Sequence, residues 1–227
     1  MINNSADAFP ALKREYDNHS LSHVKVIPQL SFRDALQGWL LDVLPESNCS
    51  LHTRMLANCY LDAFLNEKPE TNMTVCHLVA LLCLSTAMKV EQNCVFSLEY
   101  ISEFFEHKFN TETIRMLEIY ILKTLNWRVI IPTPASIIRL IIGVFFEEND
   151  YTSLVEKADL MGLVGLIHSD IACSGEFLIS IASVSLSLRL LGFTNFLEEW
   201  WVELVKNFDV SRIEVELLES KIMGKLN

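Results

Sequence analysis

The stretch VCHLVALLCLSTAM, residues 75–88, has apolar residues on every side of a helical wheel. A helix without a polar face must be surrounded by other elements. A second stretch of this kind, FLISIASVSLSLRLL, occupies residues 177–191. The small residues Ser, Ala and Cys in these stretches let neighbouring helices approach closely. We therefore expect two helical bundles, each built around one central helix.

Helical periodicity is found on both sides of each central stretch. It predicts helices at about 32–43, 51–66, 74–90, 97–108 and 111–125, with Ser31 as the N-cap of the first. The prolines of IIPTPAS (130–136) then predict a boundary, and Pro134 is suited to begin a new helix. Five more helices are predicted at about 134–146, 153–168, 175–191, 195–207 and 211–223, where SLVE (153–156) and SRIE (211–214) match the capping box.

The predicted fold class is all-α, with two consecutive five-helix bundles whose third helix is central and buried. The first bundle covers residues 31–131 and the second covers residues 132–227. Residues 1–30 form an N-terminal segment with one short helix near residues 11–16. No stretch with the alternation of a β-strand competes with this interpretation.

Composition limits the classes of function. Hydrophobic residues make up 51% of the chain, and Gly and Pro are few, as in a compact helical protein. The net charge is −11, from 18 basic and 29 acidic residues, which argues against nucleic-acid binding and suits a basic protein partner. The 6 cysteines form no CxxC pair and have no His-rich neighbours, so we expect buried, reduced thiols and no metal site.

Membrane insertion and secretion are not expected. The two apolar stretches are shorter than the ~18 unbroken apolar residues that a span needs, and His77, Ser183 and Ser187 interrupt them. Residues 1–10 lack the basic start and apolar core of a secretory signal. We therefore expect a protein of the nucleus, the cytoplasm or both.

Four motifs together resemble the cyclin family. They are FRDALQGWLLDV (32–43), YLDAFL (60–65), AMKVEQ (87–92) and MLEIYILKTLNW (116–127), in the order and at the spacing of the family. The resemblance covers residues 31–134, the N-terminal cyclin box, while residues 135–225 resemble the C-terminal box by helix pattern alone. It implies a regulatory subunit that binds and activates a cyclin-dependent Ser/Thr protein kinase in cell-cycle control, has no catalytic residues and needs no cofactor.

The resemblance also implies roles for individual residues. Arg33 and Asp62 are expected to form a structural ion pair inside the first bundle, because a buried charge must be paired. Five residues are expected to bind the kinase: Lys89, Val90, Glu118, Leu122 and Trp127. Six are expected to line a groove that docks short substrate or inhibitor motifs carrying Arg and Leu: Phe32, Ala35, Leu36, Trp39, Asp42 and His77.

Two other classes of function stay open at this point. One is a cyclin-fold binding or scaffold module with a non-kinase or transcription-related partner, because Val90 replaces the family's usual aromatic residue and Gln92 replaces a common acid. The other is an enzyme, which the sequence disfavours. It contains no GxSxG, HExxH, GxGxxG or P-loop motif, and the adjacent residues of HSD (168–170) cannot form a catalytic relay.

Overall fold

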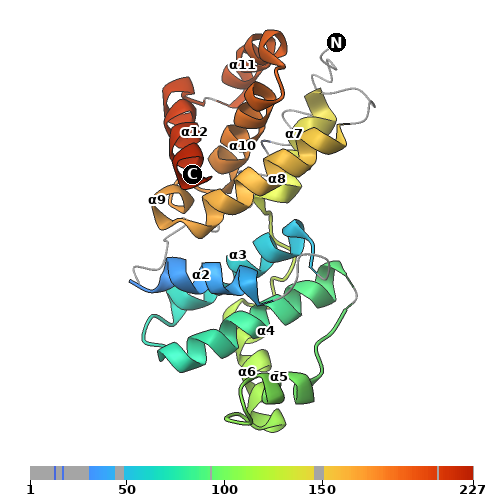
Figure 1. Ribbon diagram of the computed structural model, residues 1–227, viewed down its shortest axis with the longest axis vertical. Helices are drawn as coiled ribbons and strands as arrows, with labels where there is room; N and C mark the ends of the chain where they lie inside the picture. The colour runs from blue at the N-terminus through green and yellow to red at the C-terminus, as the bar shows by residue number, and fades with distance from the viewer. Residues whose placement is uncertain are drawn as a thin grey trace. The chain divides into compact units, whose positions relative to one another are not determined.

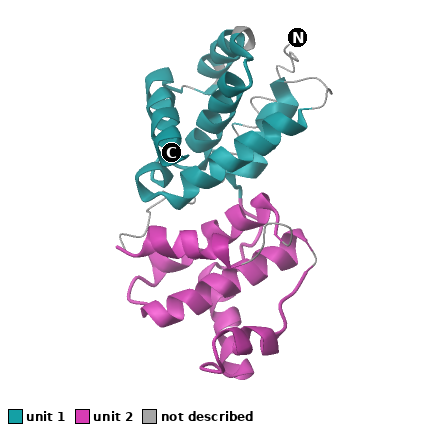
Figure 2. Cartoon of the chain, viewed as in Figure 1, with its two compact units in different colours: residues 1–26, 132–227 teal, residues 27–131 magenta. Residues whose placement is uncertain are grey.

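The computed structural model describes residues 13, 17, 31–43, 49–92, 94–145, 151–208 and 210–226. These residues contain no strand and form the helices α2 to α12 (Figure 1), so the all-α prediction is confirmed. The chain divides into two compact units, residues 27–131 and residues 1–26 with 132–227 (Figure 2). The division falls at the predicted boundary beside Pro132. The short helix predicted near residues 11–16 lies almost wholly outside the described residues.

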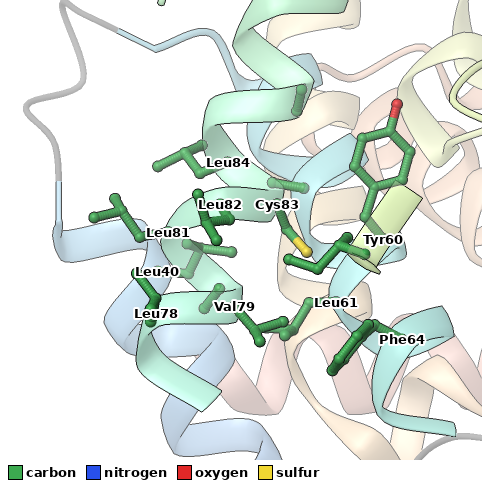
Figure 3. Close-up of a cluster of buried hydrophobic side chains, with 14 of the residues drawn as sticks. Leu40, Tyr60, Leu61, Phe64, Leu78, Val79, Leu81, Leu82, Cys83 and Leu84 are labelled. Atoms are coloured by element: carbon green, nitrogen blue, oxygen red, sulfur yellow. The ribbon is translucent and has the colours of Figure 1, made fainter. Parts of the chain in front are cut away.

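The unit of residues 27–131 is built around helix α4. Its helices are α2 (Arg33–Asp42), α3 (Leu51–Glu67), α4 (Met73–Glu91), α5 (Leu98–Phe104) and α6 (Thr111–Thr124). Helix α4 packs against α2, α3 and α6, and residues 78–88 are all buried. Figure 3 shows this core, in which Leu78, Val79 and Leu82 of α4 lie among Leu40 of α2 and Leu61 and Phe64 of α3. The first predicted central helix is therefore confirmed.

Helix α4 is also long and apolar enough to cross a membrane, by length and composition alone. Among the described residues it is the one helix that passes this test, and 67% of its apolar 18-residue window is buried inside the structure. This burial is typical of the core helix of a folded unit.

Side-chain caps explain where most helices of this unit begin. Ser50, Asn72, Ser97 and Asn110 each accept a hydrogen bond from a backbone N–H in the first turn of α3, α4, α5 and α6. Helix α2 differs, because its N-cap is Phe32, which makes no side-chain capping hydrogen bond. The prediction that Ser31 caps α2 is wrong, since the helix begins one residue later than expected.

Helix α5 is shorter than the predicted helix over residues 97–108. It ends at Phe104 because Glu106 and His107 have left-handed backbone conformations, with φ of 53° and 59°. The side chain of Ser102 donates a hydrogen bond to the carbonyl oxygen of Phe109 at 2.8 Å, which closes the turn. The turn that follows α5 thus stabilises this seven-residue helix.

The second unit is built around helix α10. Its described helices are α7 (Pro134–Phe145), α8 (Thr152–Ile167), α9 (Ser169–Ala172), α10 (Glu176–Leu190), α11 (Thr194–Phe208) and α12 (Arg212–Leu226). Helix α10 packs against all five of the others, and residues 179–188 are all buried. The second central helix is confirmed, but the described set has six helices where five were predicted, because the four-residue helix α9 follows α8 directly.

Some helices of this unit begin where the sequence predicts, and one does not. Pro134 begins α7 as predicted, and the Thr133 and Ser136 side chains each accept from the backbone N–H of the other residue, at 3.3 and 2.9 Å. Ser211 accepts from the backbone N–H of Glu214 at 3.4 Å, as SRIE predicts. The prediction that SLVE forms a capping box is wrong, because α8 begins at Thr152, before Ser153.

The cysteines are all free, and four of them are buried. Cys94 and Cys173 are exposed, which corrects the prediction of buried thiols for these two. Both lie outside the helices of their units.

Candidate functional site

The motif residues of α2 and α3 form a buried polar cluster. Arg33 lies opposite Asp62, with its Nε donating to Oδ1 at 2.9 Å and an Nη donating to Oδ2 at 2.6 Å. The two side chains are 1% and 3% exposed. Gln37 Nε2 donates a further hydrogen bond to Asp62 Oδ1 at 2.8 Å. The carboxylate of Asp62 therefore joins two residues one turn apart on α2 to helix α3.

Burial opposes the charge on Arg33, but the carboxylates of Asp62 and Asp34 outweigh it. Desolvation would lower the pKa of the guanidinium, whereas its hydrogen bonds and Coulomb attraction to Asp62, and then to Asp34, raise it above its ordinary value. A bidentate pair of this geometry holds the two helices in one register. The cluster is structural and lies inside the unit, as the sequence led us to expect for these two residues.

Lys89 and Glu118 form an ion pair between α4 and α6. Lys89 lies in the last turn of α4, where a cation is favoured by the helix dipole, and its Nζ donates to Glu118 Oε1. The side chains are 36% and 18% exposed, so neither is removed from solvent. An ammonium group has three N–H donors and a carboxylate has several acceptor sites. Lys89 and Glu118 can therefore each hydrogen-bond a partner protein while they remain hydrogen-bonded to each other.

Apolar side chains lie beside this ion pair. Val90 follows Lys89 and is exposed, while Leu122 is half-buried and lies one helical turn after Glu118, on the same face of α6. Trp127 is 62% exposed in the segment that follows α6. Val90 and Leu122 thus adjoin the two charged residues along α4 and α6, and Trp127 lies beyond the end of α6. We call these residues the α4–α6 surface: Lys89, Val90, Glu118, Leu122 and Trp127.

The backbone presents Trp127 in an uncommon conformation. Asn126 and Trp127 both have left-handed φ angles, 52° and 59°, and for a bulky residue this is a genuine outlier. The N–H of Trp127 donates to the carbonyl oxygen of Leu122 at 2.8 Å, which ends α6. The Tyr60 hydroxyl donates to the carbonyl oxygen of Val129, and burial raises the pKa of Tyr60, so it stays a donor. The segment after α6 is thus tied to α3.

The residues expected to line a docking groove do not all reach the surface. Ala35 and Asp42 are exposed, Phe32 and Trp39 are half-buried, and the Trp39 ring meets His77 edge to face at 4.7 Å between centroids. Leu36 is 2% exposed and belongs to the hydrophobic core. The prediction that Leu36 lines the groove is therefore wrong, because at this position α2 turns its side chain toward the core of the unit.

Several contacts at these sites were missed by reasoning from the sequence. Gln37 lies four residues after Arg33, and this spacing could have indicated its contact with Asp62. His52 of α3 pairs with Glu91 at 3.2 Å, at the end of α4 that carries Lys89. Only the tertiary structure reveals this pair, because no local pattern relates the two residues. Among the described residues no group of three His, Cys, Asp or Glu side chains gathers as metal ligands would.

Residues 11–130 match the family model described as the N-terminal domain of cyclin. The chain belongs to the cyclin family. This cyclin is 37% identical over 114 residues to Cyclin-D4-2 of Oryza sativa subsp. japonica, covering 48% of this chain and 29% of that protein. It is 35% identical over 112 residues to Cyclin-D3-1 of Arabidopsis thaliana, covering 46% and 29%. The matched part of the chain thus spans under a third of the length of these two relatives.

Solved structures show the same fold for this cyclin. It superposes on a viral cyclin from herpesvirus saimiri with a TM-score of 0.70 and 15% identity, covering 96% of this chain and 97% of that one. It also matches a chain of the CAK complex of Chaetomium thermophilum bound to ATP-gamma-S, with a TM-score of 0.57 and 15% identity, covering 98% and 72%. At this identity the likeness shows the fold alone, and it extends over both units of the chain.

Proposed function

We propose that this protein is a regulatory subunit that binds and activates a cyclin-dependent Ser/Thr protein kinase in cell-cycle control. The observation that carries the proposal is the Lys89–Glu118 ion pair, which joins the last turn of α4 to the middle of α6, with the exposed Val90 next to Lys89. Membership of the cyclin family and similarity to plant D-type cyclins support it. We also propose that the protein acts in the nucleus, the cytoplasm or both.

Activation would take place by contact, without chemistry on this chain. In a protein kinase, a strand lysine and a glutamate on the regulatory helix must pair before phosphoryl transfer is efficient. The α4–α6 surface would bind that regulatory helix in its active position and so shift the kinase toward its active conformation. The ion pair supplies charged hydrogen-bonding groups, while Val90, Leu122 and Trp127 supply the apolar part of the contact.

The first prediction tests the ion pair by truncation. We expect Lys89→Ala and Glu118→Ala each to weaken kinase binding about thirty-fold or more, because a charged contact buried at an interface contributes roughly 2–5 kcal/mol. Affinity purification with the whole chain identifies the kinase, and titration calorimetry measures the dissociation constants. Lys123→Ala is the matched control, since this lysine is exposed on α6 outside the α4–α6 surface. Full binding by both variants would contradict the proposal.

Exchange of the two charges distinguishes a role of the ion pair in kinase recognition from a role in stabilising the fold. The double variant Lys89→Glu with Glu118→Lys keeps an ion pair between α4 and α6 but reverses what the surface presents. We expect it to unfold at the same urea concentration as the natural protein and still fail to bind the kinase. Recovery of binding in the double variant would show that the pair only supports the fold.

A cyclin-fold module with a non-kinase partner is the second candidate, and the identity of residue 90 favours it. Val90 is exposed and smaller than the aromatic residue usual in the family, so the apolar contact is reduced. Val90→Phe distinguishes the two candidates. A kinase regulator gains affinity for the kinase from the larger side chain, whereas a module with another partner gains none.

A further inference from the structure

The outer face of helix α12 exposes large apolar side chains. The inner face of α12 packs against α8, α9 and α10, and its residues Val215, Leu218 and Ile222 are buried. On the outer face Ile213 is 80% exposed and Leu217, one helical turn later, is 57% exposed. Figure 1 shows α12 at the edge of its unit. Large aliphatic side chains grouped on one exposed face are typical of a protein interaction site.

Small residues continue this face toward the end of the helix. Ser220 and Gly224 are exposed and follow Leu217 at steps of three and four residues, so they lie on the same side of α12. A Cβ atom added at Gly224 meets nothing within 4 Å, so packing within the unit does not require the poor helix former glycine there. We call Ile213, Leu217, Ser220 and Gly224 the α12 face. Its first half is bulky and its second half is small.

A second copy of α12, running in the opposite direction, fits the α12 face in a single register. Ile213 and Gly224 are centred on the point of the helix between residues 218 and 219, and so are Leu217 and Ser220. A twofold axis through that point therefore places Ile213 over Gly224 of the second copy and Leu217 over Ser220 at the same time. This reciprocal pairing of bulky with small residues is the pattern of an isologous dimer interface.

The charges beside the α12 face favour the same orientation. Glu214 is exposed, and Lys221 and Lys225 follow it at steps of seven and four residues, on the same side of the helix. Lys221 donates to the backbone carbonyl oxygen of Asp170 at 3.1 Å and Lys225 pairs with its carboxylate at 3.3 Å, and each ammonium group keeps further donors. An antiparallel copy brings Glu214 near the two lysines of its partner, whereas a parallel copy would place Glu214 against Glu214.

We propose that this protein forms a homodimer in which the α12 faces of two copies pack against each other with the helices antiparallel. The contact is one helix wide and buries less than the roughly 800 Å² per partner of a stable interface. The dimer is therefore weak and reversible, with a dissociation constant in the micromolar range. The inference is independent of kinase binding, because the residues of the α4–α6 surface belong to the other unit.

Sedimentation equilibrium of the whole chain, from low micromolar to several hundred micromolar protein, tests the proposal. We expect the weight-average mass to rise with concentration from that of one chain toward that of two. A mass of one chain at every concentration would overturn the proposal and leave the α12 face to a different protein.

Substitutions locate the contact. We expect Leu217→Glu to remain a monomer throughout, because a carboxylate in the apolar contact loses its hydration without gaining a partner. Met116→Glu is the matched control, since Met116 is 58% exposed, as open as Leu217, but lies on α6 of the other unit. Both variants should unfold at the same urea concentration as the natural protein. A dimer that survives Leu217→Glu, or that Met116→Glu weakens equally, would refute the proposed interface.

A mixing experiment tests the pairing of charges. Glu214→Lys makes this side of α12 entirely basic, and Lys221→Glu with Lys225→Glu makes it entirely acidic. We expect each variant alone to dimerise at least about ten-fold more weakly than the natural protein, because like charges then face each other. An equimolar mixture should associate as tightly as the natural protein. A mixture that associates no better than its components would contradict the antiparallel pairing.

Two further measurements keep this proposal separate from kinase binding. Leu217→Glu should retain kinase binding, and Lys89→Ala should retain the dimer. Loss of the kinase contact in Lys89→Ala alone, or of the dimer in Leu217→Glu alone, is the result expected if the two surfaces act independently. Loss of the dimer in Lys89→Ala would overturn the assignment of self-association to the α12 face.

Discussion

At the scale of single residues, the cluster of Arg33, Gln37 and Asp62 places charged and polar groups in the interior of the first unit. Two charges lie almost completely out of water, and each is acceptable there only because the other is present. Removal of Arg33 takes the cation away from the buried Asp62, and removal of Asp62 leaves Arg33 with the partly exposed Asp34 in place of its buried partner. In either case the cost of the poorly compensated charge is larger than the net contribution of the pair.

We therefore predict that Asp62→Ala destabilises the protein by roughly 3–5 kcal/mol, measured by urea unfolding. Asp42→Ala is the control, because Asp42 is exposed on α2, and we expect a change within about 0.5 kcal/mol. Replacement of both charges, in Arg33→Met with Asp62→Leu, should restore most of the lost stability. A cost for Asp62→Ala as small as that for Asp42→Ala would show that the cluster does not support the unit.

At the scale of helices, close approach to the central helix α10 depends on a glycine in α8. A Cβ atom added at Gly165 would lie 2.7 Å from Cγ2 of Ile179 on α10, too close for any ordinary contact. The two helices are packed together at this point. Gly143 of α7 differs, because a Cβ atom there meets nothing within 4 Å. Helical propensity favours Ala at both positions, so packing alone decides between them.

We predict opposite effects for the two substitutions. Gly165→Ala should destabilise the second unit by about 1–3 kcal/mol, because the extra methyl group overpacks the contact between α8 and α10. Gly143→Ala should stabilise it by about 0.5–1 kcal/mol, because Ala is the better helix former. Urea unfolding of the whole chain, followed by tryptophan fluorescence, measures both. Stabilisation by Gly165→Ala would mean that α8 and α10 can move apart at no cost.

At the scale of the whole molecule, each unit has a core of its own. The apolar core residues of the first unit all come from positions 36–125, and its buried ion pair joins α2 to α3 within the same unit. All residues of the α4–α6 surface belong to it as well. A unit of this size is large enough to bury a stable core.

We expect residues 27–131, produced alone, to fold and to keep the kinase-binding surface. Nuclear magnetic resonance should show the dispersed amide signals of a folded helical protein, and the dissociation constant for the kinase should rise less than ten-fold. A fragment that is folded but no longer binds would show that the second unit contributes to binding. A fragment that is unfolded would show that the core of this unit is insufficient by itself.

The sequence by itself determined the all-α class, the two central helices and most helix starts. These features depend on local patterns: apolar residues around a whole helical wheel, a capping side chain, or a proline that suits a first turn. The motifs of the N-terminal box also indicated that Arg33 and Asp62 are partners. The same patterns misplaced the start of α2 by one residue and the end of α5 by four, because turn geometry decides such boundaries.

The tertiary structure alone decided which side chains meet and which reach the surface. Leu36 and Trp39 are both apolar residues of α2, yet Leu36 is buried in the core, whereas Trp39 is half-buried and meets the rings of His77 and Phe104. Lys89 meets Glu118, and His52 meets Glu91, across segments far apart in the chain. Such contacts depend on how helices pack, and a periodicity along one helix carries no information about which neighbour will cover each face.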